Sequence, residues 1–221
     1  MSATMCTARA DLITNGSFET PIVTSGLEYQ DINPGSEPPG FAWTVVSGNV
    51  DVVIRGSNFA LNAVDGLQFL DLDGFTAGAI VQSFATTPGD AYFLSFAYAN
   101  NPTGVTIPAY ATVRAFDSIT NAELIAPLLI THGDATIANP DWKQSETIRF
   151  VAQGANTTLS FTSDDSRGSD GGIFLDAVSV DVAAIPEPGS LALVLIGLAF
   201  AIAAHGSRHR RLMIIRPFGK R

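Results

Sequence analysis

The sequence has few of the residues on which several large classes of site depend. Its 221 residues include one cysteine, Cys6, and three histidines. A single cysteine excludes an intramolecular disulfide, a cysteine-built zinc cluster and a CxxC redox pair. Basic residues are also scarce, because 12 Lys and Arg stand against 21 Asp and Glu, for a formal net charge of −9. Phosphate binding needs clustered cations, so nucleic acid is not expected as a partner.

Helical periodicity is missing from most of the chain. Between residues 11 and 182 no window sustains the i, i+3, i+4, i+7 apolar spacing of an amphipathic helix. Apolar residues instead alternate with period two in segments 50–54, 92–98 and 178–182, and turn pairs such as Asn15-Gly16 and Pro88-Gly89 separate such runs. This pattern predicts one all-β domain over residues 11–183, an antiparallel β-sandwich or jelly roll. The proline-rich segment 25–40 is expected to be a long irregular loop.

The two ends of the chain differ from this domain. Residues 1–10 are polar and contain no apolar signal-peptide core, so we expect a disordered N-terminus and a leader upstream of Met1. After residue 185 an uncharged run, 190–204, reaches with its flanks almost the roughly 20 residues of a membrane span. Basic residues follow it, which predicts a single transmembrane helix with a cytoplasmic C-terminus and the sandwich outside. A buried core helix is the alternative.

The C-terminal layout resembles a known sorting signal. A Pro-Glu-Pro motif, a short apolar helix and an arginine-rich end occur in that order in residues Pro186, Glu187, Pro188, Arg208, Arg210 and Arg211. This order is similar to the PEP-CTERM sorting segment of bacterial proteins, here 184–211, and a basic tail, 212–221, continues beyond the usual end. The resemblance implies processing by an exosortase in a Gram-negative envelope, passage through the membrane, and a surface or secreted location in an extracellular polysaccharide or biofilm matrix.

The domain itself resembles the choice-of-anchor C family. The resemblance is carried by Asn15-Gly16-Ser17-Phe18-Glu19, Trp43-Thr44-Val45, Gly48-Asn49-Val50-Asp51, Ala63-Val64-Asp65-Gly66, Phe69-Leu70-Asp71-Leu72-Asp73-Gly74 and the closing Phe174-Leu175-Asp176-Ala177-Val178. It implies a galactose-binding-like jelly roll, contact with carbohydrate and no established enzymatic activity. It also implies a structural calcium ion held by Glu19 and Asp176. Simple hydrogen bonding of these two carboxylates at the sheet rim is the alternative.

Catalytic residues are hard to assemble from this sequence. A triad would depend on His132, because His205 and His209 lie in the tail, and we interpret His132 as a surface loop residue beside Gly133. The acidic pairs are mostly interpreted as solvated turn residues; they are Asp71 with Asp73, Asp164 with Asp165, and Glu19 with Asp31. A glycosidase needs two carboxylates roughly 5 to 9.5 Å apart, which no spacing in the sequence singles out. We therefore predict a non-catalytic protein, with a glycan-active hydrolase as the remote alternative.

Sugar binding requires exposed aromatic rings beside polar groups. We predict ligand-binding roles for Tyr29, Tyr98, Asn100 and Tyr110, with Trp142 as a further aromatic candidate, and we expect Trp43 in the core. The resulting hypothesis is an exported surface or matrix protein whose domain binds polysaccharide. A structural or adhesive protein that makes protein–protein contacts is the second hypothesis.

Overall fold

The computed structural model describes residues 11–24, 26–54, 62–103, 108–164 and 171–183. Within these ranges the chain forms twelve β-strands, and none of it is a helix long and apolar enough to cross a membrane. Segments 1–10, 184–211 and 212–221, on which the disordered N-terminus, the sorting segment with its transmembrane helix and the basic tail were predicted, lie outside the described residues.

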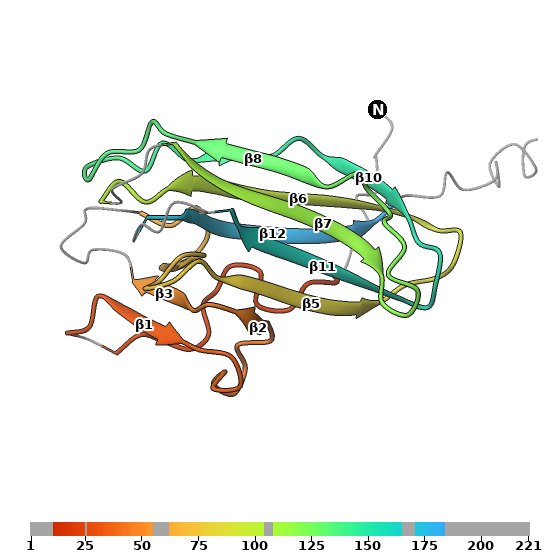
Figure 1. Cartoon of the computed structure of the whole chain (residues 1–221), viewed down its shortest axis with the longest axis horizontal. Helices are drawn as coiled ribbons and strands as arrows, with labels where there is room; N and C mark the ends of the chain where they lie inside the picture. Colours follow the sequence, from red (N-terminus) through yellow and green to blue (C-terminus); the bar gives the residue numbers. More distant parts are fainter. Residues whose placement is uncertain (1–10, 25, 55–61, 104–107, 165–170, 184–221) are drawn as a thin grey trace, which may run out of the picture. The chain divides into compact units, whose positions relative to one another are not determined.

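The strands form two antiparallel sheets (Figure 1). The first sheet has the order β1-β3-β4-β12-β6-β10, with β9 also paired to β6: β1 (Tyr29–Ile32), β3 (Val50–Ile54), β4 (Gln68–Asp71), β12 (Ile173–Val182), β6 (Ala91–Asn100), β10 (Ile148–Val151) and β9 (Lys143–Gln144). The second has the order β2-β5-β11-β7-β8: β2 (Thr44–Ser47), β5 (Ala79–Ala85), β11 (Asn156–Ser163), β7 (Ala109–Asp117) and β8 (Leu128–His132). The predicted antiparallel β-sandwich is therefore confirmed.

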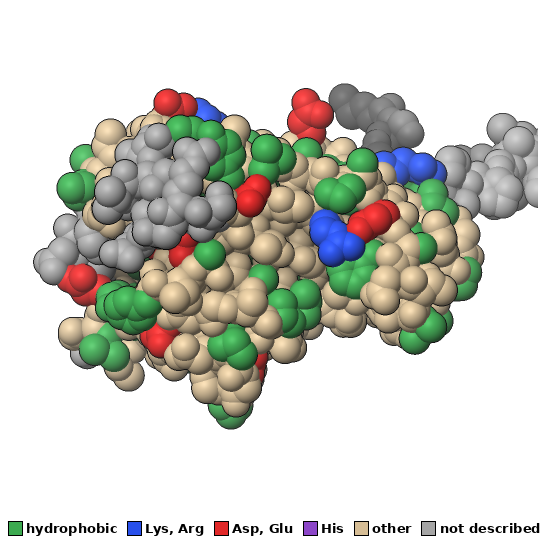
Figure 2. Space-filling view, viewed as in Figure 1, with side chains coloured by type: hydrophobic (Ala, Val, Ile, Leu, Met, Phe, Trp, Pro, Cys, Tyr) green, Lys and Arg blue, Asp and Glu red, His purple; other side chains and the backbone are tan. Residues whose placement is uncertain are grey.

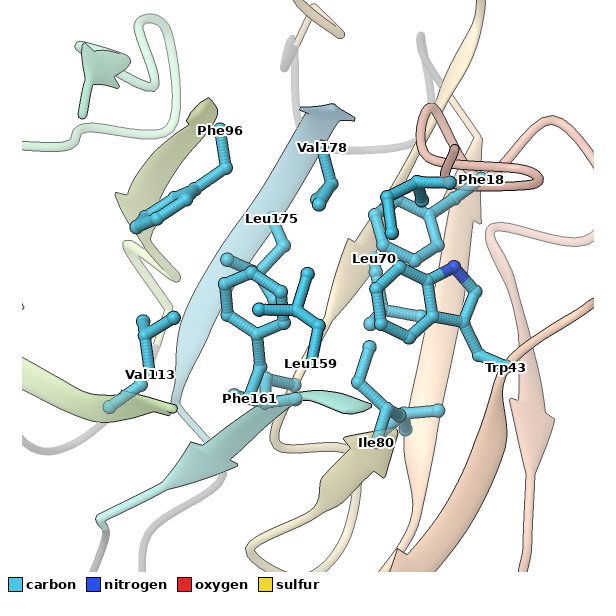
Figure 3. Packing of buried hydrophobic residues seen from close by; sticks show 14 of the residues in the cluster. Phe18, Trp43, Leu70, Ile80, Phe96, Val113, Leu159, Phe161, Leu175 and Val178 are labelled. Atoms are coloured by element: carbon cyan, nitrogen blue, oxygen red, sulfur yellow. The ribbon is translucent and has the colours of Figure 1, made fainter. Parts of the chain in front are cut away.

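The main core lies between the two sheets, where aromatic and aliphatic side chains from both interdigitate (Figure 3). The Trp43 indole, predicted to be in the core, is buried and lies 6.0 Å from the Phe161 ring in an edge-to-face arrangement. Phe161 in turn meets Phe96 of the opposite sheet with centroids 5.2 Å apart. Edge-to-face aromatic pairs add to the stabilisation that burial alone gives, so this chain of rings ties the sheets together.

A second, smaller cluster covers the other face of the first sheet. It contains Val53, Phe69, Ala99 and Phe174, with Trp142 packed against it. Strand β3 is consequently buried on both faces, which its period-two pattern did not predict, whereas β12 keeps the predicted alternation from Val178 to Val180. Side chains on this outer face therefore lie in a partly apolar environment. The residues of the candidate functional site, described in the next subsection, lie on this face.

The segment predicted as one long irregular loop, 25–40, contains a strand. Residues Tyr29–Ile32 form β1, which pairs antiparallel with β3 at the edge of the first sheet. The prolines that suggested a loop, Pro34, Pro38 and Pro39, all follow the strand and do not interrupt its pairing. The prediction was therefore wrong for these four residues. Their pairing places Tyr29 and Asp31 beside β3.

Candidate functional site

Three aspartates face one another across three neighbouring strands. Asp31 of β1 is the register partner of Asp51 of β3, and Asp51 is the register partner of Asp71 of β4. We call Asp31, Asp51 and Asp71 the acid row; Phe174 of β12 continues it beyond Asp71. Like charges directly opposite in a sheet destabilise it. The row therefore requires protons, hydrogen-bond donors or a positively charged ligand to offset its charge.

Neutral groups donate hydrogen bonds to the two end residues of the acid row, Asp31 and Asp71. Asp31 accepts hydrogen bonds from the amide nitrogens of Asn49 and Asn33. Asp71 accepts from the backbone N–H of Asp73 at 3.0 Å and from Asn101 Nδ2 at 2.9 Å, through different oxygens. The ends of the row are thus anchored by hydrogen bonds to neighbouring loops.

The middle of the row is different. Asp51 is only 9% exposed, and its Oδ1 is buried with no hydrogen-bond partner among the described residues. A buried carboxylate oxygen without a donor costs free energy on the order of 1–3 kcal/mol or more. Such atoms in native structures call for an explanation. Asp51 Oδ1 is thus an acceptor that no described donor uses.

The protonation behaviour of the row follows from burial and mutual repulsion. Burial, followed by the charge of Asp31 and a hydrogen bond with its carboxyl group, raises the pKa of Asp51 to about 7. Burial also raises the pKa of Asp71 well above its ordinary value, although the backbone N–H of Asp73 opposes this. Asp51 therefore exchanges protons near neutral pH, and a cationic ligand would favour its ionised form.

The acid row borders a cavity of about 190 Å³. Its described lining comes from β1, β3, β4 and β12, from the residue before β1 and from the loops after β4 and β6: Glu28, Tyr29, Asp51, Val53, Asp71, Gly74, Phe75, Asn101, Thr103 and Phe174. We call it the acid-row pocket. Its described lining includes three carboxyl groups and no Lys, Arg or His. Figure 2 shows one face of the molecule, on which acidic side chains are dispersed and basic ones are few.

Two aromatic rings stand at the pocket with much of their surface in solvent. Tyr29 is 40% exposed and Phe75 is 67% exposed. Their ring centroids lie 6.4 Å apart at an interplanar angle of 68°. Hydrophobic rings of this size are usually covered in a folded domain. Exposed rings beside a cavity that also contains carboxyl groups provide the apolar surface on which the C–H face of a sugar can stack.

Buried amides hold the pocket loops in place. Asn49 Oδ1 accepts hydrogen bonds from Phe75 N at 3.1 Å and from Thr76 N at 2.8 Å, so it fixes the loop that presents the Phe75 ring. Gly74 permits the same loop to come close, since a Cβ there would lie 2.9 Å from Asn49 Nδ2 and 3.1 Å from Asp51 Oδ1. Asn49 is therefore a positioning residue for this wall of the pocket.

The interpretation of the acidic pairs as solvated turn residues was wrong for Asp71 and Asp73. Both are buried, because the loop after β4 folds back over the sheet: Gly78 N donates to Leu72 O at 3.0 Å and Gly74 N to Asn49 O at 3.2 Å. An Asp-x-Asp-Gly motif is common in exposed turns. Only the tertiary contacts of this loop distinguish a buried motif from an exposed one.

Glu19 and Asp176, the predicted calcium ligands, bind one loop from two sides. Glu19 Oε1 accepts from the N–H groups of Leu67 and Gln68 at 2.7 and 2.8 Å. Asp176 is fully buried; its Oδ2 accepts from Val64 N at 2.6 Å and Asp65 N at 3.0 Å, and its Oδ1 accepts from Ala177 N at 2.7 Å. Because N–H donors occupy these oxygens, the contacts favour the hydrogen-bonded alternative. Calcium at this pair stays a prediction from the resemblance.

The predicted ligand-binding residues do not come together. Tyr29 lines the acid-row pocket. Tyr98 packs instead against the main core and lines a separate, mostly apolar cavity beside β8 and β10. Asn100 is buried, and Tyr110 lies on the side of β7 that faces away from the core. Of the four, only Tyr29 reaches the pocket, and the adjacent Asn101 reaches it in place of Asn100.

His132 is not a surface loop residue, contrary to the sequence-based interpretation. It ends β8 with 4% of its surface exposed, and its Nδ1 lies 2.6 Å from Asn100 Oδ1. Burial lowers the pKa of His132. Its Nε2 lies near Asp134 and Asp141, a grouping with metal-ligand chemistry, but Asp141 Oδ2 already accepts from Lys143 Nζ at 2.7 Å. The arrangement is that of a buried structural histidine.

Sequence reasoning missed Asp51, Asp71, Phe75 and Asn101 as members of one site. The available signal was an aspartate at equivalent outward positions of two short strands, in Asn49-Val50-Asp51 and Phe69-Leu70-Asp71. Acidic residues are disfavoured in strands, so their repetition there indicates a role. Their alignment depends on the register of β3 and β4, which the sequence does not specify.

Comparison with solved structures shows the fold. An arabinose-bound α-L-arabinofuranosidase is similar with a TM-score of 0.50 and 15% identity, over 80% of this chain and 27% of that one. TmCBM61 in complex with β-1,4-galactotriose has a TM-score of 0.49 and 14% identity, over 79% of this chain and 99% of that one. A xylan-binding domain, CBM22-1, from Paenibacillus barcinonensis has a TM-score of 0.44 and 16% identity, over 80% and 98%.

The likeness to the arabinofuranosidase, at a TM-score of 0.50 and 15% identity, shows a similar fold and nothing about a shared ligand. The chain spans about a quarter of the arabinofuranosidase, so that likeness concerns one part of the enzyme. No curated protein sequence matches the chain. A family model does match residues 11–181, the whole of the sandwich apart from its last two residues. The chain therefore belongs to the family described as "Protein of unknown function (DUF642)".

Proposed function

We propose that this protein binds polysaccharide without cleaving it, and that the acid-row pocket is the binding site. The observation that carries the proposal is the combination of two exposed rings, Tyr29 and Phe75, with the unused acceptor Asp51 Oδ1 at one cavity. Sugars present C–H faces that stack on rings and hydroxyls that need acceptors. Both needs are met here within one pocket.

The size of the pocket limits what it holds. At about 190 Å³ it lies below the range of about 300 to 1,000 Å³ typical of cavities that enclose drug-sized ligands. It therefore accommodates one sugar ring, either a chain end or a side branch, while neighbouring rings of a polymer stay outside. Such a site recognises a polymer through one unit at a time, and its affinity for a single chain end is modest.

The protonation of the carboxyl groups supports a non-catalytic role. Glycoside hydrolysis needs two carboxyl groups whose environments move their pKa values apart, so that one is protonated and the other ionised. In the acid row, burial moves the pKa values of both Asp51 and Asp71 in the same direction, upward. Neither Asp51 nor Asp71 therefore has the lowered pKa that a carboxylate nucleophile requires.

Binding of an oligosaccharide panel, measured by calorimetry, tests the proposal. Tyr29→Ala and Phe75→Ala are each expected to weaken binding about tenfold or more, because each removes a stacking surface. Tyr110→Ala is the matched control, since Tyr110 belongs to β7 of the other sheet and is not among the lining residues. Equal affinity of the Tyr29 variant and the wild type, or a loss confined to the Tyr110 variant, would overturn the assignment of the site. Release of reducing ends would contradict the non-catalytic role.

We further propose that the protein is exported and sorted through its C-terminal segment, with an exosortase as its processing partner. The support is the sequence order of Pro186-Glu187-Pro188, the apolar run and the basic cluster ending at Arg211. Reporter fusions at residues 150 and 221 are expected to give opposite sides of the membrane before processing. The same cytosolic side for both fusions would contradict export. Surface adhesion through protein–protein contacts remains the alternative if no glycan binds.

A further inference from the structure

We infer that the sugar unit bound at the acid-row pocket carries an ammonium group, so that the ligand is a deacetylated amino sugar. This inference rests on the proposed function and specifies the chemistry of the ligand. It starts from the composition of the site: the described lining holds two buried carboxyl groups, Asp51 and Asp71, and no described cationic side chain. A neutral sugar leaves the ionised form of either carboxyl group without a counter-charge, whereas an ammonium group provides one.

The hydrogen bonds already made within the pocket indicate that the ligand supplies one strong donor. Both oxygens of Asp71 accept hydrogen bonds from protein donors, and Asn101 Oδ1 accepts from Thr103 N and Thr103 Oγ1 at 3.0 and 2.7 Å. Asp51 Oδ1 has no partner among the described residues. An ammonium donates to a carboxylate through a charge-assisted hydrogen bond, which is shorter and stronger than a hydrogen bond between neutral groups. Asp51 is the residue best placed to receive it.

The aromatic wall adds a second reason. Tyr29 and Phe75 present rings to the same cavity. Ring faces attract ammonium groups through the cation–π interaction, and they also stack on the apolar face of the sugar ring. A carboxylate and two rings around one cavity therefore match a ligand with a cationic substituent on an otherwise stackable ring. An acidic sugar would be repelled by the same carboxyl groups.

A divalent metal ion fits the pocket less well. Calcium takes six to eight oxygen ligands. Among the described lining residues, the oxygens of Asp71 and Asn101 already accept hydrogen bonds, and Val53, Phe75 and Phe174 contribute apolar surface. A single unused carboxylate oxygen suits an ammonium hydrogen bond better than a hard, strongly hydrated cation. Metal dependence is therefore an outcome that would overturn the inference.

The test uses three tetrasaccharides with the same β-1,4 backbone that differ only at carbon 2: hydroxyl in cellotetraose, acetamide in the N-acetylglucosamine tetramer and ammonium in the glucosamine tetramer. Calorimetry at pH 7 on the full chain is expected to give at least tenfold tighter binding of the glucosamine tetramer. Asp51→Asn should abolish this preference and bring the three affinities within about twofold. Asp134→Asn, an exposed acid outside the pocket, is the charge-matched control and should keep the preference.

The pH dependence provides a second readout. Among the described residues, the titratable register partners of Asp51 are Asp31 on β1 and Asp71 on β4, and Glu28 lines the same pocket. Because ammonium binding favours ionised Asp51, whose pKa is raised to about 7, affinity for the glucosamine tetramer should fall about tenfold or more between pH 7 and pH 5. Asp51→Asn should flatten that profile. A neutral tetrasaccharide should show no such decline.

The outcomes separate the two proposals. Equal affinity of the wild type for all three tetramers, with binding lost in Tyr29→Ala, overturns the amino-sugar inference and leaves polysaccharide binding in place. A preference that survives in Asp51→Asn also overturns the inference. Binding that a chelator abolishes and calcium restores assigns the pocket to a metal ion and overturns it too. No binding of any glycan in the wider panel overturns both proposals.

Discussion

Two buried aspartates on the same sheet, Asp51 and Asp176, have opposite hydrogen-bonding situations. In both cases burial is the largest cause that raises the pKa to about 7. Asp176 accepts three backbone N–H groups and ties β12 to the loop at Val64. Asp51 has a buried oxygen that accepts from no donor in the described part of the chain, and it borders a cavity. A raised pKa by itself therefore does not identify a binding site. The two sites are distinguished by whether protein donors already occupy the carboxyl oxygens.

The largest effect expected from this comparison is on stability, at Asp176. Asp176→Ala removes a fully buried carboxyl group that accepts from the N–H groups of Val64, Asp65 and Ala177, so all three lose this partner. We expect the free energy of unfolding to fall by about 3 kcal/mol, measured by urea denaturation at pH 7. Asp51→Ala is the matched control and should cost far less. Equal losses in the two variants would remove the distinction between a structural and a ligand-binding carboxylate.

An intermediate effect is expected at Asp51, with the opposite sign. The folded-state pKa of about 7 lies above the ordinary value of 3.8, so the folded state binds more protons and its stability decreases as pH rises through that window. Asp51→Asn removes both the buried charge and its repulsion with Asp31. We expect it to raise the free energy of unfolding by about 1 kcal/mol at pH 8 and to change it little at pH 4. A destabilised variant at pH 8 would mean that Asp51 has a structural partner.

Asp176→Asn gives the corresponding test at the other carboxylate. Its pKa is raised over the same window, so the ionised form is also disfavoured there. Asparagine, however, offers one acceptor oxygen where the carboxylate offers two. Its NH₂ group would face backbone N–H donors, from which it cannot accept a hydrogen bond. We therefore expect no gain in stability at pH 8, in contrast to Asp51→Asn. Thermal unfolding of both variants over pH 4–8 distinguishes the two sites without any ligand.

Calcium should give the smallest effect. Glu19 Oε1 and both carboxyl oxygens of Asp176 already accept N–H groups. We expect the unfolding midpoint to change by less than about 1 °C between excess calcium and a chelator, because a ligand stabilises a fold only if it binds the folded state. A larger rise that Glu19→Gln abolishes would establish the calcium ion at this pair and alter the structural side of the comparison.

The sequence predicted the architecture better than the site. Alternating apolar residues and turn pairs identified the sandwich, and Trp43 was placed correctly in the core. The sequence did not predict the acid row, because successive members of Asp31, Asp51 and Asp71 are 20 residues apart. They come together only through the register of the strands. The same limitation affected His132, whose neighbouring Gly and Asp suggested a turn, although the end of β8 is buried against Asn100.

Tyr29 and Tyr98 illustrate the limit for aromatic residues. Both lie near turn residues in the sequence, and both were predicted to bind ligand. The structure places Tyr29 at an edge strand with 40% of its surface exposed, whereas Tyr98 packs against Phe96 and His132. Local sequence gives the period of a strand but not which of its faces the second sheet covers. That choice decides whether a ring stacks on a ligand or fills the core.

The most direct test of the acid-row pocket as the binding site is an NMR titration of the domain with a glycan that binds. Backbone amide shifts are predicted to concentrate at Tyr29, Gly74, Phe75, Asn101 and Thr103, which line the pocket. Shifts that concentrate instead around Tyr110 and Thr112 on β7 would contradict the account and move the site to the second sheet.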